Sequence, residues 1–352
     1  MIDLITKLQH LVTKKIDGKN LHGIAVKVEK GNGEVIFKGS SGNLGVDTQY
    51  FIASTTKIYI TALIMKLVSE DKISLDDTLE KFFSDAIVSN LNNFRGTDYC
   101  SEITIRNLLA HTSGIPDYFM GKLPDGTSLL DSITQGKDQT WTFEDALTMA
   151  KSQSSGFKPN QKGRALYSDT NFQILGRIVE IVRDSTIAEV LMDEIFKPLG
   201  LGSTYLYVDS EDKKPLPLYY KDKTLNIPKA MTSFKADGGI VSTLDDCMKF
   251  VKAFFDGSIF PKSYLEEMTV EFNRIFFPLQ YGVGLMKFDF PSIFTLFRKT
   301  PILLGHSGLS GAFSYYSPQL DLYICGTVNQ IAYPSNSYRM LVEVMQMLKN
   351  NL

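Results

Sequence analysis

The pattern of apolar residues predicts one helix that is apolar almost all the way round, within residues 51–70. The segment reads FIASTTKIYITALIMKLVSE, a short strand-like start that runs into a helix without a polar face. A helix of this kind is buried in the protein core. We therefore expect the rest of the chain to be organised around this segment.

Both ends of the chain carry patterns of strands and amphipathic helices. Residues 4–12 have apolar side chains at helical spacing, and the runs 23–29 and 34–41, separated by Lys-Gly-Asn-Gly, predict a β-hairpin. Three more strands and a closing helix are predicted near the C-terminus, in residues 303–308, 311–317, 320–329 and 338–348.

The middle of the chain is predicted to be mainly helical. Helical patterns occupy five segments: 75–83, 104–114, 142–150, 167–182 and 187–203. Another helix is expected after the Gly-Gly turn at residue 238, with its cap near Ser242 or Thr243. The polar, Gly/Pro-punctuated stretch 117–141 is too long for a simple connection, and loops of this kind often line binding sites.

This order of elements predicts an α+β fold. One antiparallel sheet is built from both chain ends and flanked by the terminal helices, and a helical subdomain is inserted between its halves. We expect the sheet subdomain to span residues 1–70 and 232–352, and the helical subdomain to span 71–231.

Charge and cysteine usage exclude several classes of function. A net charge of −2 leaves no basic footprint, so nucleic acid is not an expected partner. Cys100, Cys247 and Cys325 are odd in number and far apart, which argues against a disulfide scaffold and is typical of a reducing compartment.

Neither a metal site nor a membrane span is predicted. The four histidines have no ligand spacing with one another or with the cysteines, so no metal or cofactor is expected. No apolar run reaches membrane-spanning length, and the N-terminus alternates Lys with apolar residues, unlike a signal core. We expect a cytoplasmic protein if Met1 is the natural start, and an exported one if the chain is a trimmed form.

Ser54 and Lys57, at the head of the buried helix, are the first candidates for chemistry. Ser54 lies where a helix N-cap is expected, and Lys57 follows three residues later on the same face. A capping pair normally has Glu or Gln at that position, whereas a cation there opposes the helix dipole. Such a breach at a buried position is typical of a functional site. A neutral Lys57 would take the proton of Ser54, and a plain capped core helix is the alternative.

Tyr167 and Asp169 stand at the head of a second predicted helix. Asp is a routine cap there, and a Tyr beside it can relay a proton if it faces the first pair. His111 is assigned to the last turn of its helix, where it suits the dipole, without a catalytic role.

The sequence GHSGLSG, residues 305–311, has two interpretations. It is either a strand that turns tightly at its glycines, or a Gly-rich strand edge whose backbone N–H groups form an oxyanion hole. A nucleophile elbow centred on a serine is excluded for two reasons. The spacing is not Gly-x-Ser-x-Gly, and such a hydrolase needs its His after the Ser in the chain, whereas no His follows His306.

Taken together and in this order, the three sites resemble those of the serine β-lactamase and penicillin-binding protein superfamily, in particular its class C β-lactamase-like branch. There, Ser-x-x-Lys heads a buried helix, Tyr-x-Asn follows, and Lys-Thr-Gly or His-x-Gly lies on a sheet strand. The counterparts here are Ser54 to Lys57, Tyr167 to Asp169, and His306 to Gly308. The resemblance covers most of the chain from about Gly23, through ISLDDTLEKF, IRNLLAHTSGIP, YSDTNFQILGRIVE, KPLGLGSTYL, GGIVSTLDDCMKF and GHSGLSGAFSYYSP.

The resemblance implies an acyl-enzyme mechanism. Ser54 would attack a carbonyl, Lys57 and Tyr167 would share the general base and acid work, and the backbone N–H groups of Ser54 and Leu309 would form the oxyanion hole. Substrate contacts are expected from Asp169, His306, Ser307, Gly308 and Leu309.

Two departures from the family pattern bear on the substrate. Asp169 replaces the usual Asn. Its charge favours a charged Lys57 and shifts the role of general base toward Tyr167. His306 replaces the usual Lys, so a fixed cation for a substrate carboxylate is missing.

We therefore expect a serine hydrolase that forms an acyl-serine on a small ester or amide. The alternatives are a D-amino-acid peptidase or DD-carboxypeptidase, a weak β-lactamase, and a catalytically silent ligand-binding or assembly protein. The expected partner is a small-molecule substrate, and the sequence leaves the substrate's identity and the oligomeric state open.

Overall fold

The two ends of the chain meet in one antiparallel sheet, as predicted. The computed structural model describes residues 2–290 and 300–351. Within them, eight strands follow the order β10-β11-β12-β13-β14-β15-β1-β2, and Val26 of the N-terminal part pairs with Gly326 of the C-terminal part. The strands are β10 (Asn273–Phe276), β11 (Leu279–Tyr281), β12 (Met286–Phe288), β13 (Leu303–Ser307), β14 (Phe313–Ser317), β15 (Leu322–Thr327), β1 (Gly23–Lys30) and β2 (Val35–Gly42).

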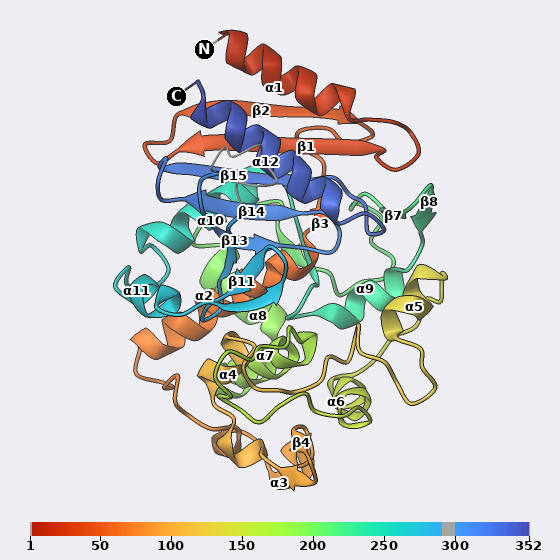
Figure 1. The fold of residues 1–352 in the computed structure, drawn as a ribbon, viewed down its shortest axis with the longest axis vertical. Helices are drawn as coiled ribbons and strands as arrows, with labels where there is room; N and C mark the ends of the chain where they lie inside the picture. Colours follow the sequence, from red (N-terminus) through yellow and green to blue (C-terminus); the bar gives the residue numbers. More distant parts are fainter. Residues whose placement is uncertain (1, 291–299, 352) are drawn as a thin grey trace.

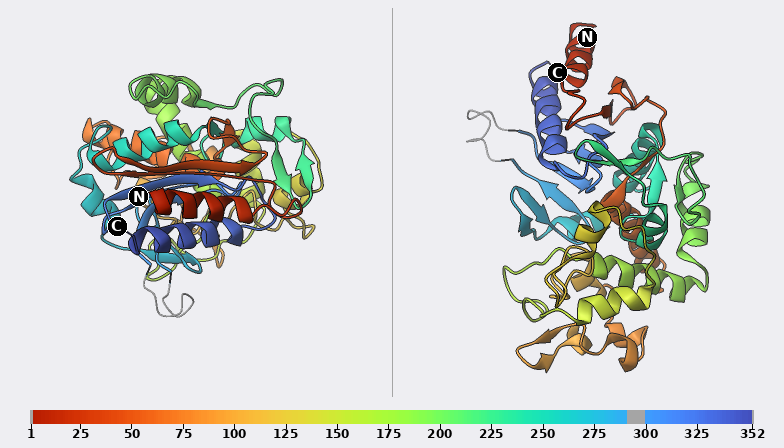
Figure 2. Two further views of the ribbon diagram at one scale, coloured as in Figure 1. Left: turned by 90° about the horizontal axis from the view of Figure 1, so that it is seen from above. Right: turned by 90° about the vertical axis from the view of Figure 1, so that its right-hand side faces the viewer.

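Helices cover both faces of this sheet. The terminal helices α1 (Ile2–Lys14) and α12 (Ser335–Lys349) lie side by side on one face, and α10 (Leu244–Asp256) packs on the other (Figures 1 and 2). In α1 the apolar residues at helical spacing are the buried ones, because this stripe faces the sheet.

The expected buried helix is α2 (Thr56–Ser69). Lys66, Val68 and Ser69 are its only residues that are not buried. The helix lies between the sheet and α7 (Asp169–Arg183), so it has apolar neighbours on all sides (Figure 1). This position explains why its sequence has no polar face.

The middle of the chain forms the helical part. Its helices are α3 (Asp85–Val88), α4 (Ile105–Leu109), α5 (Leu129–Thr134), α6 (Phe143–Lys151), α7, α8 (Ile187–Leu191) with a π-helical extension (Met192–Phe196), α9 (Pro228–Phe234) and α11 (Tyr264–Thr269). Short strands accompany them: β3 (Tyr50–Phe51), β9 (Ile240–Ser242) and β6 (Tyr205–Leu206) form a small sheet, and β4 (Asn93–Phe94) with β5 (Thr97–Asp98) and β7 (Leu218–Tyr220) with β8 (Lys223–Leu225) form hairpins. The subdomain boundaries given above remain a prediction.

Some local predictions were wrong. Residues 75–83 form only a 3-10 turn (Leu79–Lys81), and the helix expected in 104–114 ends at Leu109. It ends early because the backbone oxygen of Asn107 accepts from the N–H of Thr112, and His111 adopts a positive φ of 57°. His111 therefore lies beyond the helix and not in its last turn.

Candidate active site

Ser54 lies in a tight turn ahead of α2. It is the central residue of a 3-10 turn (Ala53–Thr55) that begins at Ala53 with a φ of 46°. Thr55, and not Ser54, is the N-cap of α2, and it makes no side-chain cap. The prediction that Ser54 caps the helix was wrong in this respect, and its hydroxyl is left for other contacts.

Tyr167 contacts Ser54 from the segment just before α7. The two side-chain hydroxyls are close enough to interact electrostatically. Burial raises the pKa of Tyr167 well above its ordinary value, with the charge of Asp169 as the next cause, and the interaction with the hydroxyl of Ser54 opposes them. Tyr167 is therefore a neutral phenol near pH 7, suited to passing a proton on.

Lys57 forms a buried ion pair with Asp169 directly beneath this contact. Its Nζ donates to Oδ1 of Asp169 at 2.5 Å and to the backbone oxygen of Asp237 at 2.7 Å. The same Nζ lies 5.2 Å from the ring centre of Tyr167, and the side chain of Lys57 is fully buried. The structure thus brings together the residues of the first and second motifs.

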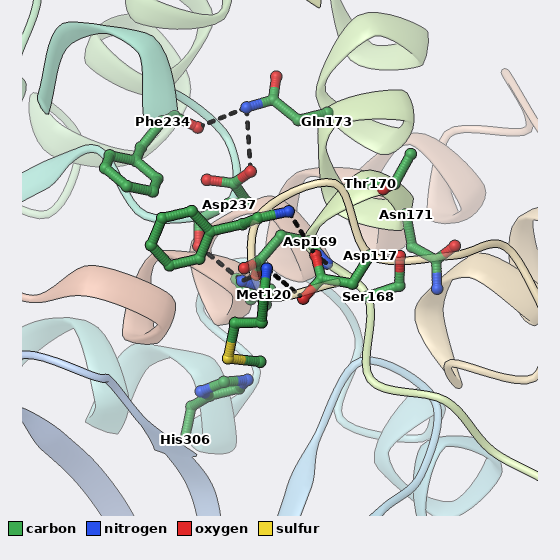
Figure 3. Close-up of polar contacts among 12 residues, drawn as sticks. Asp117, Met120, Ser168, Asp169, Thr170, Asn171, Gln173, Phe234, Asp237 and His306 are labelled. Atoms are coloured by element: carbon green, nitrogen blue, oxygen red, sulfur yellow. Dashed lines mark hydrogen bonds and ion pairs between the residues drawn. The ribbon is translucent and has the colours of Figure 1, made fainter. Parts of the chain in front are cut away.

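Two further buried carboxyl groups surround this pair. The carboxyl group of Asp117 accepts from the backbone N–H of Asp169 at 3.1 Å, and Oδ2 of Asp237 accepts from Tyr118 at 2.7 Å and from Gln173 at 3.0 Å. Figure 3 shows Asp117 and Asp169 close together, with Asp237 nearby and His306 apart from them.

Crowding and burial make these carboxyl groups weak acids. Burial, followed by the charge of Asp169, raises the pKa of Asp117 to about 7 and that of Asp237 well above its ordinary value. The sequence did not identify either residue. The only signal was that Asp117 opens the long polar stretch in which a binding site was expected.

The third motif approaches Ser54 through its backbone. A Cβ at Gly308 would lie 2.4 Å from the backbone oxygen of Ile52 and 3.2 Å from the backbone nitrogen of Ser54. Only glycine permits this approach, which brings the backbone of the third motif against the turn that carries Ser54. Ser310 holds the strand end in place, because its hydroxyl donates to the backbone oxygen of Phe51 at 2.8 Å.

His306 lies behind the site and not in it. Its side chain is fully buried, Nδ1 donates to the backbone oxygen of Ser307 at 2.8 Å, and Nε2 accepts from the hydroxyl of Tyr281 at 2.9 Å. Burial, followed by the charge of Lys57, lowers the pKa of His306 to about 3. His306 is therefore neutral, as expected, but its position does not agree with a direct substrate contact.

Two apolar cavities of unequal size flank Ser54. The larger has a volume of about 390 Å³, within the range of ligand sites, and the smaller about 50 Å³. Both are lined by Ser54, Phe119, Asp169 and Leu309. The larger cavity adds Met120, Tyr167, Phe276, Phe277, Leu279, Met286, Ser307, Gly308, Pro334, Ser335 and Tyr338, and the smaller adds Ala53, Leu130, Ile133, Leu218, Ile227, Met231, Phe234, Asp237, Gly238, Ser310 and Ile331.

The described residues that line these cavities carry carboxyl groups but no cationic side chain. Among the described residues that line them there is no Lys or Arg, whereas Asp169 and Asp237 are both present. Lys162 and Arg164, just before the second motif, line a separate cavity with Arg106. Lys57 is buried and paired with Asp169.

No described helix, from residue 2 to 290 or from 300 to 351, combines the length and the apolar character needed to cross a membrane.

Curated relatives match part of the chain. A putative D-alanyl-D-alanine carboxypeptidase of Escherichia coli O157:H7 is 30% identical over 194 residues, which are 54% of this chain and 38% of the relative. The chain thus matches well under half the length of that protein.

Solved structures match almost the whole chain and confirm the expected fold. The D-amino acid amidase of Ochrobactrum anthropi SV3, in complex with D-phenylalanine, superposes with a TM-score of 0.80 at 22% identity and covers 99% of both chains. An octameric penicillin-binding protein homologue from Pyrococcus abyssi gives a TM-score of 0.72 at 25% identity, covering 97% of this chain and 77% of the other.

The family prediction made from the three motifs is also confirmed. A family model described as Beta-lactamase matches residues 8–337, a span that contains all three motifs and both cavities apart from Tyr338. Together with the amidase and carboxypeptidase relatives, this match indicates a serine hydrolase. The chain belongs to the beta-lactamase family.

Proposed function

We propose that this chain hydrolyses small esters or amides through an acyl-Ser54 intermediate, and that its substrates carry no carboxylate next to the reacting carbonyl. The observation that supports this most strongly is the pair of apolar cavities on either side of Ser54, whose described lining residues include Asp169 and Asp237 but no Lys or Arg. A substrate carboxylate placed there would lie near the carboxylate of Asp169 and find no cation among these residues.

In the proposed reaction, Oγ of Ser54 attacks the substrate carbonyl carbon while its proton passes to Tyr167, whose hydroxyl interacts with that of Ser54. The phenol is neutral, so it accepts that proton only as it gives its own to Lys57, which acts in its amine form after the ammonium paired with Asp169 has lost one proton to solvent. Asp169, at 2.5 Å from Nζ, stabilises the ammonium that forms. The negative oxygen of the tetrahedral intermediate faces the backbone N–H groups of Ser54 and Leu309.

The second half of the reaction returns the proton. The bond to the leaving alcohol or amine breaks as the proton passes from Lys57 through Tyr167 to the departing atom. Water then attacks the acyl-Ser54 ester by the same route, which releases the acid and restores the hydroxyl of Ser54.

A matched pair of esters tests the charge argument. Phenylacetyl-glycolamide and phenylacetyl-glycolate differ only by an amide or a carboxylate on the leaving group. We expect kcat/KM to favour the amide by about 10- to 100-fold, the value of one charge-assisted hydrogen bond that the carboxylate does not find. Because His306 stays neutral, the preference should hold at both pH 5.5 and pH 8. A preference for the carboxylate at pH 8 would favour a carboxypeptidase or β-lactamase instead.

A second candidate is an amidase for substrates with a protonated amine beside the reacting carbonyl. Asp237 supports it, since its Oδ1 is buried without a hydrogen-bond partner among the described residues and Asp237 lines the smaller cavity. The D-amino acid amidase among the similar structures is consistent with this chemistry. Assays of D- and L-phenylalanine amide against their N-acetyl forms decide, because only the ammonium of a free amine can stabilise Asp237 as a carboxylate against the burial that raises its pKa.

A further inference from the structure

The loop whose Phe119 lines both cavities is bound to the backbone of the second motif by one buried carboxyl group, that of Asp117. Oδ1 of Asp117 accepts from the backbone N–H groups of Phe119 and Asp169, each at 3.1 Å, and Oδ2 accepts from the N–H of Met120 at 3.2 Å. Figure 3 shows Asp117 between these two stretches of chain. Asp117 is only 6% exposed and lines neither cavity.

The groups that Asp117 holds are the ones that the proposed reaction uses. Asp169 is paired with Lys57, the proposed proton acceptor. Phe119 lines both cavities, and Met120 lines the larger one. Asp117 therefore couples the arrangement of the proton-transfer pair to the position of the wall against which the substrate packs.

Neighbouring contacts attach the same two segments but do not reach these groups. The hydroxyl of Thr170 donates to the backbone oxygen of Pro116 at 2.7 Å and accepts from the N–H of Tyr118 at 3.0 Å. The hydroxyl of Ser168 donates to the same Pro116 oxygen at 3.1 Å. These bonds keep the loop close to the start of α7. The backbone oxygen of Phe119 also accepts from the N–H of Leu130 at 3.0 Å, whereas Asp117 accepts from the backbone N–H groups of Phe119, Met120 and Asp169.

We propose that Asp117 is a positioning residue that sets both the reactivity of the Lys57–Asp169 pair and the shape of the substrate cavities. The proposal rests on the proposed function, because it assigns Asp117 a part in the same reaction. It predicts that changes at Asp117 alter kcat through Asp169 and KM through Phe119 and Met120, although Asp117 touches no substrate.

Two variants separate these effects. Asp117→Asn keeps one oxygen for the N–H groups of Phe119 and Asp169 but turns an NH2 group toward the N–H of Met120. It should raise KM for an apolar ester more than it lowers kcat. Asp117→Ala loses all three bonds, and kcat/KM should fall by about 100-fold, the effect of misplacing reacting groups by about 1 Å.

Asp125→Asn is the matched control. Asp125 lies in the same loop and also accepts from backbone, at the N–H of Thr127, but it is exposed and is not among the described residues that line the two cavities. We expect kcat and KM of this variant to equal those of the wild type.

The measurements are kcat and KM for p-nitrophenyl butyrate, the melting temperature, and labelling of Ser54 by a fluorophosphonate probe. A lower melting temperature with unchanged kcat and KM in Asp117→Asn shows a purely structural role and overturns the proposal. If Asp117→Ala does not fold, Asp117→Asn decides alone. If wild-type Ser54 is not labelled, the proposed function fails; if it is labelled and the Asp117 variants keep wild-type kinetics, only the present proposal fails.

Discussion

Replacing Asp169 by Asn probes the electrostatics of the site most sharply. The substitution removes one negative charge 2.5 Å from Nζ of Lys57 and keeps an oxygen of nearly the same shape. It also removes a charge that contributes to the raised pKa values of Asp117 and Asp237. The proposed nucleophile and the cavity walls are left as they are.

The size of the effect follows from the burial of the pair. Breaking a buried ion pair costs about 3–5 kcal/mol. The amide oxygen of Asn still accepts a hydrogen bond from the ammonium, worth about 1.5–3 kcal/mol. The ammonium of Lys57 is therefore less stable in the variant by about 1–3 kcal/mol.

The sign of the change is fixed by the charge that is lost. The negative charge of Asp169 favours the ammonium of Lys57, so the variant should reach its acylation plateau at a lower pH than the wild type. The plateau itself should fall by about 10-fold, because the ammonium that forms during attack is less well stabilised.

Pre-steady-state release of p-nitrophenol from p-nitrophenyl butyrate, between pH 5 and pH 9, measures acylation separately from deacylation. Asp125→Asn is the control for loss of one carboxylate from the same chain. If the profile of Asp169→Asn overlays that of the wild type over this range, Asp169 does not control Lys57 and the proposed proton path is wrong.

Two other predictions follow from the same structure. Ser54→Ala should abolish turnover with a melting temperature close to the wild type, because Ser54 does not cap α2; residual esterase activity above a few per cent would place the nucleophile elsewhere. His306 is neutral when folded, with a pKa of about 3 against an ordinary 6.5, so it stabilises the fold above pH 6.5, and this contribution is lost as the pH falls toward 3. Between pH 7 and pH 5 that loss is about 2 kcal/mol. Urea unfolding measures the free energy of unfolding at pH 7 and at pH 5. Between these two pH values it should fall by about 2 kcal/mol less in His306→Gln than in the wild type. Equal losses in the two proteins would disprove the linkage.

The sequence predicted the fold well where the hydrophobic pattern is strong. The apolar run of α2, the hairpin of β1 and β2, and the amphipathic α1 and α12 have the periodicity that their burial requires. The strands β10 to β12 were not predicted, because they are only three or four residues long and too short to establish a period of two.

The motif residues that contact one another could be found from the sequence, but their surroundings could not. Ser54, Lys57, Tyr167 and Asp169 stand at helix heads, where a local rule is broken or a cap is expected, and these local signals led to the site. Asp117 and Asp237 are brought in by tertiary packing, from a loop and from the segment before β9, and nothing in their local sequence predicts burial. His306 matched a motif position, but only the structure shows that its ring lies behind the cavity wall.

Covalent labelling of the native protein tests the central claim most directly. A fluorophosphonate probe reacts with a serine only where a base and an oxyanion hole activate it. Intact mass followed by peptide mapping should show one adduct, on Ser54, formed in the wild type and absent from Ser54→Ala. A wild-type protein that gains no adduct, or one that carries it on another residue, would contradict the assignment of Ser54 as the nucleophile and favour a catalytically silent member of the family.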